Sequence, residues 1–229
     1  MYPFFYYPWD ILIFAAFGLS IWASFRVKST FRRWSQVPIH SRMTGYEAAR
    51  RMLDANGLHD VPVEAVPGQL TDHYDPTKRV LRLSEPVYYE HSIAAVSVAC
   101  HEVGHAIQHS NHYPALVMRH RMFPLVNFTS GISPYLIIAG ILLSMSNLIF
   151  IGILFFSAAV AFQLVTLPVE FNASSRARKQ MVVQGFINEQ ENIGAGKVLN
   201  AAALTYVAAA LVSLLQLLKF VMIFLNNRR

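Results

Sequence analysis

Three long apolar stretches dominate the chain. The first covers residues 9–25, the second covers residues 122–169 without a single charged side chain, and the third covers residues 198–225 with only Lys219 as a charged residue. One membrane crossing takes about 20 residues, so the 48 residues of the second stretch suit two helices. We therefore predict four transmembrane helices, one in the first stretch, a hairpin of two in the second and one in the third.

Basic residues indicate the orientation. Four of them, within residues 26–33, directly follow the first apolar stretch, and the cytoplasmic flanks of membrane helices are rich in Lys and Arg. We expect the N-terminus outside, an aromatic interfacial belt at residues 1–9, and residues 26–121 in the cytoplasm. A signal peptide is disfavoured because the positive charges follow the apolar run instead of preceding it.

The last apolar stretch fits this orientation least well. A full crossing puts Arg228 and Arg229 outside, against the positive-inside trend. An interfacial or re-entrant helix over residues 198–225 is therefore the alternative. For a full crossing we expect Lys219 to snorkel or to lie near the far interface.

Part of the segment between the first two stretches has the pattern of a small α+β domain. Thr44 and Glu47 form a capping box and Gly57 supplies a C-cap, which predicts a helix at residues 45–56. Alternating and turn-forming residues farther on predict a small antiparallel sheet. Residues 79–84 are our candidate edge strand, which would hold an extended peptide by strand addition. A plain hairpin that covers the next helix is the alternative.

The next helix carries a metal-binding motif. It starts near Ile93 and contains the sequence HEVGH, a His-Glu-x-x-His motif made by His101, Glu102 and His105. Two histidines four residues apart share one helix face and can bind one Zn²⁺, while the glutamate is placed to take a proton from water. Gly104 weakens the helix by about 1 kcal/mol relative to alanine, which a close backbone approach would explain. A core helix with two incidental histidines is the alternative.

A third ligand is expected after the hairpin, because two crossings return the chain to the side it left. Glu170 is the first charged residue met there, and we predict it as the third zinc ligand. We expect it in a cytoplasmic segment at residues 170–197. Pro168 is well placed to start a helix, which would carry Glu170 in its first turn. The alternative is that Glu170 only favours a helix N-terminus electrostatically. His109 continues the histidine face, but eight helical residues span about 12 Å, too far from His101 for one ion.

Composition restricts the classes of partner. Hydrophobic residues make up 54% of the chain and charged residues 14%, whereas about a quarter of the residues in a soluble globule are charged. The net charge of +6 could suggest nucleic acid, but the basic residues cluster beside the apolar stretches, so we expect a lipid bilayer and no nucleic acid as partner. The single cysteine, Cys100, excludes an internal disulfide, and we interpret it as a small buried residue rather than a nucleophile.

Three segments together resemble the bacterial YugP-like membrane zinc metallopeptidases. They are HEVGHAIQ at residues 101–108, LPVEFNAS at residues 167–174 and NAAALTYVAA at residues 200–209. The resemblance extends over nearly the whole chain, and the joint motifs are much more specific than His-Glu-x-x-His alone. More distantly, the layout is similar to HtpX-type membrane proteases, which also place a membrane hairpin between the histidines and a glutamate ligand.

This resemblance implies one zinc ion per chain, bound by His101, His105 and Glu170 in a gluzincin-like set, with Glu102 as general base. It also leads us to expect an aspartate two residues after the ligand glutamate, where this chain has Asn172. An amide can hydrogen-bond a ligand histidine but adds no negative charge to it, so we expect weaker zinc binding without loss of activity.

The sequence thus predicts a mostly α membrane protein with about four transmembrane helices and a small α+β, zincin-like cytoplasmic catalytic domain. We expect a multi-pass protein of the bacterial plasma membrane that hydrolyses protein or peptide substrates, with Arg176 and Tyr206 as candidate oxyanion donors. The alternative class is a non-catalytic membrane scaffold or regulator with a structural or vestigial zinc site, which the presence of Glu102 disfavours. A transporter is disfavoured because the apolar stretches contain almost no ionisable residues.

Overall fold

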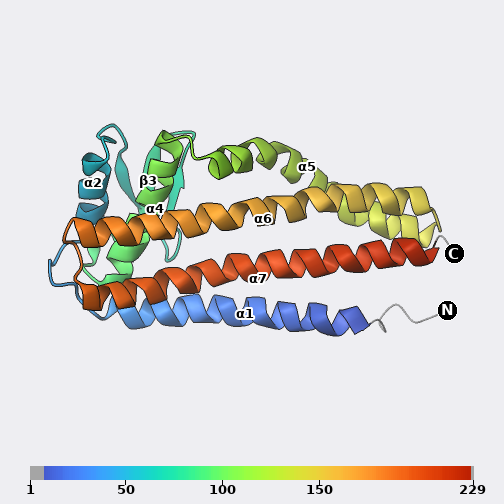
Figure 1. Ribbon diagram of the computed structural model, residues 1–229, viewed down its shortest axis with the longest axis horizontal. Helices are drawn as coiled ribbons and strands as arrows, with labels where there is room; N and C mark the ends of the chain where they lie inside the picture. Colours follow the sequence, from blue (N-terminus) through green and yellow to red (C-terminus); the bar gives the residue numbers. More distant parts are fainter. Residues whose placement is uncertain (1–7, 228–229) are drawn as a thin grey trace. The chain divides into compact units, whose positions relative to one another are not determined.

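The computed structural model describes residues 8–227 of the 229-residue chain. The expected aromatic belt at residues 1–9 and the Arg228-Arg229 tail fall outside the side chains that it describes. The elements in order are α1 (Pro8–Ser35), α2 (Gly45–Ala55), β1 (Val63–Val66), β2 (His73–Asp75), β3 (Val80–Ser84), α3 (Glu85–Tyr89), α4 (Ile93–Ser110), α5 (Pro114–Leu142), α6 (Ser146–Val183) and α7 (Glu189–Asn227). The fold is mostly helical with one small sheet (Figure 1), as predicted.

The chain divides into two compact units. Unit 1 comprises Met1–Ala23, Ala115–Pro168 and Thr205–Arg229, and unit 2 comprises Ser24–Pro114 and Val169–Leu204. Helices α1, α6 and α7 contribute residues to both units, and α5 contributes only Pro114 to unit 2, whereas α2, α3, α4 and the sheet belong wholly to unit 2.

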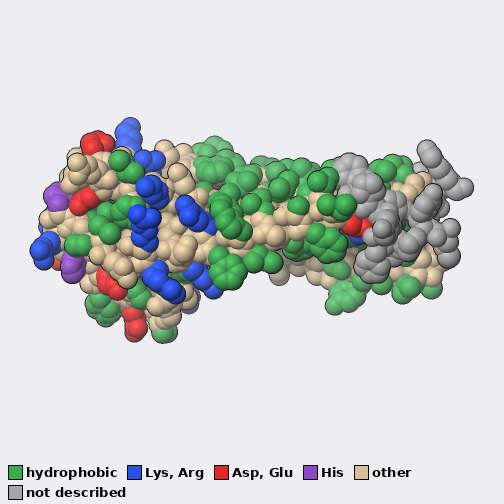
Figure 2. All heavy atoms as spheres, turned by 90° about the horizontal axis from the view of Figure 1, so that it is seen from below, with side chains coloured by type: hydrophobic (Ala, Val, Ile, Leu, Met, Phe, Trp, Pro, Cys, Tyr) green, Lys and Arg blue, Asp and Glu red, His purple; other side chains and the backbone are tan. Residues whose placement is uncertain are grey.

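Unit 1 presents an apolar surface. Large hydrophobic side chains are exposed on its helices, among them Phe14 at 69% and Leu142 at 78%, and Figure 2 shows many of them on one face. Monomeric soluble proteins rarely expose such contiguous apolar area. Four helices are long and apolar enough to cross a membrane, as predicted, with bounds Asp10–Ser35, Pro114–Leu142, Ser146–Val183 and Glu189–Asn226.

An ion pair joins the first and last of these helices inside unit 1. Lys219 Nζ donates to Oδ1 of Asp10, and the two side chains are only 18% and 9% exposed. A charge surrounded by apolar groups is costly unless it is paired. A carboxylate therefore satisfies Lys219, an ion pair that the sequence analysis did not predict.

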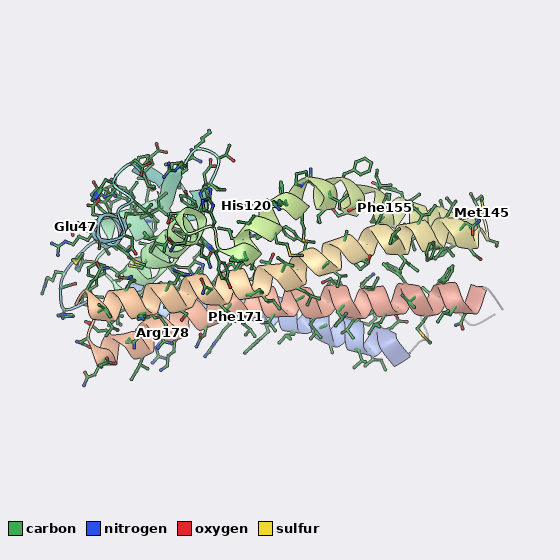
Figure 3. All side chains as sticks on the ribbon, turned by 45° about the horizontal axis from the view of Figure 1, so that its top comes forward. Glu47, His120, Met145, Phe155, Phe171 and Arg178 are labelled. Atoms are coloured by element: carbon green, nitrogen blue, oxygen red, sulfur yellow. The ribbon has the colours of Figure 1, made fainter. Side chains whose placement is uncertain are left out.

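Helix α6 continues through the point where a helix start was predicted. It extends from Ser146, just after the turn at Met145 (Figure 3), to Val183 and contains Pro168 in its interior. Proline removes one backbone hydrogen bond, but long apolar helices tolerate it where neighbouring groups satisfy the freed atoms. The prediction that Pro168 starts a helix is wrong, and the alternative role of Glu170 at a helix N-terminus is excluded with it.

The sheet of unit 2 is mixed, with strand order β1-β3-β2. Strand β3 pairs with β1 in parallel and with β2 in antiparallel orientation, so the predicted antiparallel sheet is only half right. Four of the five residues of β3 are buried, as is typical of a strand covered on both faces. Residues 79–84 are therefore not an edge strand. An edge is formed by β2 instead.

Local signals fix the helices that carry the site. The capping box of α2 forms as predicted, because Thr44 Oγ1 accepts from the Glu47 N–H and the Glu47 carboxylate accepts from the Thr44 N–H. Helix α4 begins at Ile93, where the hydroxyl of Ser92 caps it by accepting from the Ala95 N–H. Both helices pack into the single core of unit 2, which holds α4 in place.

Candidate metal centre

Three side chains from two helices converge in unit 2. His101 and His105 come from α4, and Glu170 comes from α6. Their candidate ligand atoms all lie within 4.8 Å of one another. The Nε2 atoms of His101 and His105 lie 3.4 and 3.6 Å from Oε2 of Glu170. The structure therefore brings together the three residues that the sequence predicts as ligands.

These distances suit a tetrahedral zinc ion better than direct hydrogen bonds. An N–H···O hydrogen bond usually spans about 2.7–3.2 Å, which is shorter than both separations. Two ligand atoms bound about 2.0–2.1 Å from one tetrahedral ion lie about 3.3 Å apart. The Glu170 side chain is only 3% exposed, and buried charges are generally paired or coordinate metals. The donor set therefore fits Zn²⁺ with room for one further ligand.

Helical spacing orients the two histidines toward the same point. Their ring centroids lie 4.8 Å apart and the rings are nearly perpendicular, at 85°. Burial lowers the pKa of His105, but contact with Glu170 and the charge of Glu102 outweigh burial and raise the pKa of His105 above its ordinary value. A metal ion must displace that proton, so its binding weakens as the pH falls.

Gly104 lets α4 approach α6 closely. A Cβ atom at this position would lie 2.7 Å from the backbone oxygen of Ala173 and 3.1 Å from its Cα. Ala173 is three residues after Glu170 on α6, so the missing side chain brings Glu170 toward the two histidines. The close backbone approach that the glycine predicts is confirmed.

Replacing Gly104 by alanine is expected to destabilise the protein by about 1–3 kcal/mol, because overpacking forces backbones apart. Thermal unfolding in detergent would measure the loss. Gly131→Ala in α5 is the matched control, since a Cβ there meets nothing within 4 Å and alanine improves helix propensity by about 1 kcal/mol. Equal effects of the two substitutions would contradict the proposed packing role.

Gln108 orients His105, a role that the sequence analysis missed. The amide oxygen of Gln108 can only accept, so the proton of neutral His105 lies on Nδ1, which donates to Oε1 of Gln108, 3.0 Å away. The Nε2 atom of His105, on the side of Glu170, then carries a free lone pair. The fully buried Gln108 in turn donates through Nε2 to the Val169 carbonyl, at 2.8 Å, and to Oδ1 of Asn172, at 3.0 Å. The sequence does contain an indication of this contact, because Gln108 follows His105 by three residues and therefore lies one turn along the same helix.

The other residues predicted near the site are Asn172, Arg176 and Tyr206, and the structure gives the contacts of the first two. Asn172 contacts Gln108 rather than His101 or His105, and its Oδ1 also accepts from Nε of Arg176 at 2.7 Å. The residue that contacts His101 is Ser174, whose hydroxyl lies 3.1 Å from Nδ1. Tyr206 belongs to unit 1, so its assignment to the site stays a prediction.

Glu102 faces the sheet. Its Oε2 accepts a hydrogen bond of 3.1 Å from the backbone N–H of Tyr74 in the edge strand β2. This contact places the carboxylate between the motif helix and the sheet edge. Nothing in the sequence indicated that β2, at three residues, would be the strand beside the motif.

Two nearby residues lie outside the cluster, as the sequence predicts: Cys100 is a buried structural residue, and His109 is not a candidate ligand. Cys100 is fully buried, and burial raises the pKa of its thiol, which keeps it protonated and unreactive. His109 is not one of the clustered residues, and its Nδ1 lies 2.9 Å from the hydroxyl of Tyr74.

Comparison with known proteins gives one family. A family model described as "Putative neutral zinc metallopeptidase" matches residues 9–225. The chain belongs to this family. It is also 65% identical over 217 residues to "Putative membrane protease YugP" of Bacillus subtilis (strain 168), a match that covers 95% of this chain and 96% of that protein. No solved structure matches the chain significantly. The resemblance to the YugP-like family is thus confirmed.

Proposed function

We propose that this chain is a membrane-embedded zinc metallopeptidase that hydrolyses peptide bonds of membrane or membrane-proximal proteins. The observation that carries the proposal is the convergence of His101, His105 and Glu170, with Glu102 beside them on α4. The three clustered residues are the zinc ligands and Glu102 is the general base. The descriptions of the family, as a zinc metallopeptidase, and of the Bacillus subtilis relative, as a membrane protease, support this proposal.

In the proposed hydrolysis the zinc ion and the side chains of the chain have separate roles. Zn²⁺ at this site would supply an acidified water and polarise the scissile carbonyl. Glu102 takes the proton from the attacking water and delivers it to the leaving amine. The Tyr74 N–H holds the Glu102 carboxylate by donating to Oε2, so the base is positioned before substrate arrives.

Neighbouring side chains keep the site in order. Gln108 and Ser174 accept from the Nδ1–H groups of the two histidines and fix their tautomers. Arg176 is held by Asn172 through Nε, which leaves its other guanidinium N–H groups as candidate donors to the oxyanion. Tyr206, in unit 1, stays the second candidate donor that the sequence predicts.

The substrate reaches the site as an extended strand. Strand β2 is an edge of the sheet and contacts Glu102 through Tyr74. An exposed edge binds an extended peptide through main-chain hydrogen bonds. The peptide-binding role predicted for residues 79–84 therefore passes to β2.

The location follows from charge. Basic residues at 26–33 and at 176–179 belong to unit 2, and Lys and Arg side chains gather on its surface (Figure 2). By the positive-inside rule, this unit with its site faces the cytoplasm and the N-terminus lies outside the bacterial plasma membrane.

Zinc removal tests the proposed function. The purified protein in detergent is expected to contain about one zinc per chain and to cleave an unfolded protein such as casein. A zinc chelator is expected to reduce cleavage to background, and added Zn²⁺ to restore it. Elemental analysis and peptide release are measured on the same samples. Zinc at full occupancy with no cleavage of any substrate would favour the scaffold alternative.

A further inference from the structure

A pocket of about 340 Å³ opens beside α4 in unit 2. Its lining includes Tyr74, Arg79, Ala106, His109, Ser110 and His112, and we call it the basic pocket. Three of these side chains are basic, and among the lining residues that the structure describes none is acidic. Its volume lies in the range of pockets that hold small ligands, about 300–1,000 Å³.

The basic pocket continues the face of α4 that carries Glu102. Residues four, seven and eight positions later share a helix face, and here these are Ala106, His109 and Ser110. The small side chain of Ala106 leaves space one turn, about 5 Å, beyond Glu102. A peptide whose scissile bond lies at Glu102 therefore has a neighbouring residue within reach of the pocket.

Tyr74 connects the base to the basic pocket directly. Its backbone N–H donates to Glu102, and its hydroxyl lies 2.9 Å from Nδ1 of His109 in the pocket wall. One residue of the edge strand thus contacts both places. A substrate chain that follows β2 passes from the base to the pocket within a residue or two.

Arg79 is the fixed positive charge in the wall of the basic pocket, and His109 beside it is held in its neutral form. Burial, followed by the charges of Arg79 and His112, lowers the pKa of His109. Arg79 pairs with Asp60 at 3.0 Å, but the two side chains are 52% and 59% exposed, and such exposed pairs contribute little stability. The Arg79 guanidinium can therefore turn to a carboxylate in the pocket, which it binds through two parallel hydrogen bonds.

The backbone at two of the basic residues is strained. Arg79 has φ of 52° and His112 has φ of 49°, the left-handed region that side-chain-bearing residues rarely adopt. Such strain persists where the surrounding structure fixes it, and it is common at ligand sites. Both residues bring their side chains to the same pocket.

We propose that the basic pocket binds a carboxylate of the substrate beside the scissile bond. The carboxylate belongs to an acidic side chain or to the C-terminus of the peptide. Arg79 is the specificity-determining residue, and His112 lines the same pocket as a second polar side chain. This inference rests on the proposed peptidase function and adds a substrate class to it.

A peptide series tests the basic pocket with the full-length, zinc-loaded protein in detergent. One parent peptide carries Glu, Gln or Lys at each position around the cleaved bond in turn, with its C-terminus free or amidated, and mass spectrometry gives kcat and KM. We expect a carboxylate at one position to raise kcat/KM about tenfold or more over its neutral counterpart, as hydrogen bonds to a charged group do. Amidation sensitivity without a side-chain preference would assign the carboxylate to the C-terminus.

Two variants separate specificity from folding. Arg79→Gln is expected to raise KM for the carboxylate peptide about tenfold while kcat/KM for the neutral peptide stays within about twofold. Arg79→Glu is expected to transfer the preference to Lys, a gain that misfolding does not produce. Arg51→Gln, at an exposed position of α2, is the matched control and should change nothing.

The outcomes distinguish the two proposals. If the wild type cleaves Glu, Gln and Lys peptides equally, free or amidated, the carboxylate pocket is refuted and the peptidase function stands. A preference that survives in Arg79→Glu refutes the role of Arg79. If the zinc-loaded wild type cleaves no peptide at all and no casein, the peptidase function itself is refuted.

Discussion

Replacing Glu102 by glutamine is expected to slow peptide hydrolysis by about 10²–10⁴-fold, the usual contribution of a general base, while about one zinc per chain is retained. Glutamine has almost the shape of glutamate, and its Oε1 can still accept the hydrogen bond from the Tyr74 N–H. The amide does not take a proton from water near neutral pH, so only the chemical step is lost. Peptide release and zinc content are measured on the same preparation.

Glu90→Gln is the matched control, because Glu90 is an exposed glutamate of the same unit and its removal should leave hydrolysis unchanged. Normal hydrolysis by Glu102→Gln would assign the base elsewhere. Asp72 would then be examined next, since its charge interacts with that of Glu102. Loss of zinc together with activity would instead make Glu102 part of the metal site.

Local rules predicted the part of the site that lies on one helix. His101, Glu102 and His105 follow from helical spacing, and the start of α4 near Ile93 follows from the apolar run before them. Gly104 was recognisable because a glycine inside a helix is costly and needs a packing reason, which Ala173 supplies. These inferences hold because they depend only on neighbours in the sequence.

Pairing across the sheet was not predictable in this way. The parallel pairing of Val63 with Leu81 and the antiparallel pairing of Tyr74 with Leu81 place β3 between its partners. Each pairing joins segments separated by loops, and the alternation of a short strand does not say which neighbours it has. The edge was therefore assigned to residues 79–84, whereas β2 takes that place beside Glu102.

Proline misled the prediction around Glu170 for a related reason. Pro168 is a good first residue of a helix, but α6 was already formed from Ser146 onward and continues through it. The prediction of Glu170 as a clustered residue did not need that helix start. It needed only the return of the chain after two crossings, and the cluster with His101 and His105 agrees with it.

Replacing Glu170 by alanine is expected to lower zinc affinity by more than the 10–100-fold typical of changes in residues that only support a ligand. In the proposed site the variant loses an oxygen ligand and the negative charge that offsets the ion, whereas His101 and His105 stay on α4. Elemental analysis after dialysis against a weak chelator measures the loss. Glu189→Ala, at an exposed position in the first turn of α7, is the matched control and should keep its zinc.

Thermal unfolding with and without Zn²⁺ separates loss of the ion from loss of the fold. A ligand that binds only the folded state stabilises it by about 2.7 kcal/mol at 100 times its Kd, so wild type should unfold at higher temperature when zinc is added. Glu170→Ala should show almost no such rise, because it lacks one of the three clustered ligand atoms, and its unfolding without zinc measures how much stability the contacts of Glu170 with the two histidines contribute. A full zinc-dependent rise in this variant would place the third ligand elsewhere. That result would remove Glu170 from the metal site and leave the close approach of Gly104 to Ala173 as a packing contact alone.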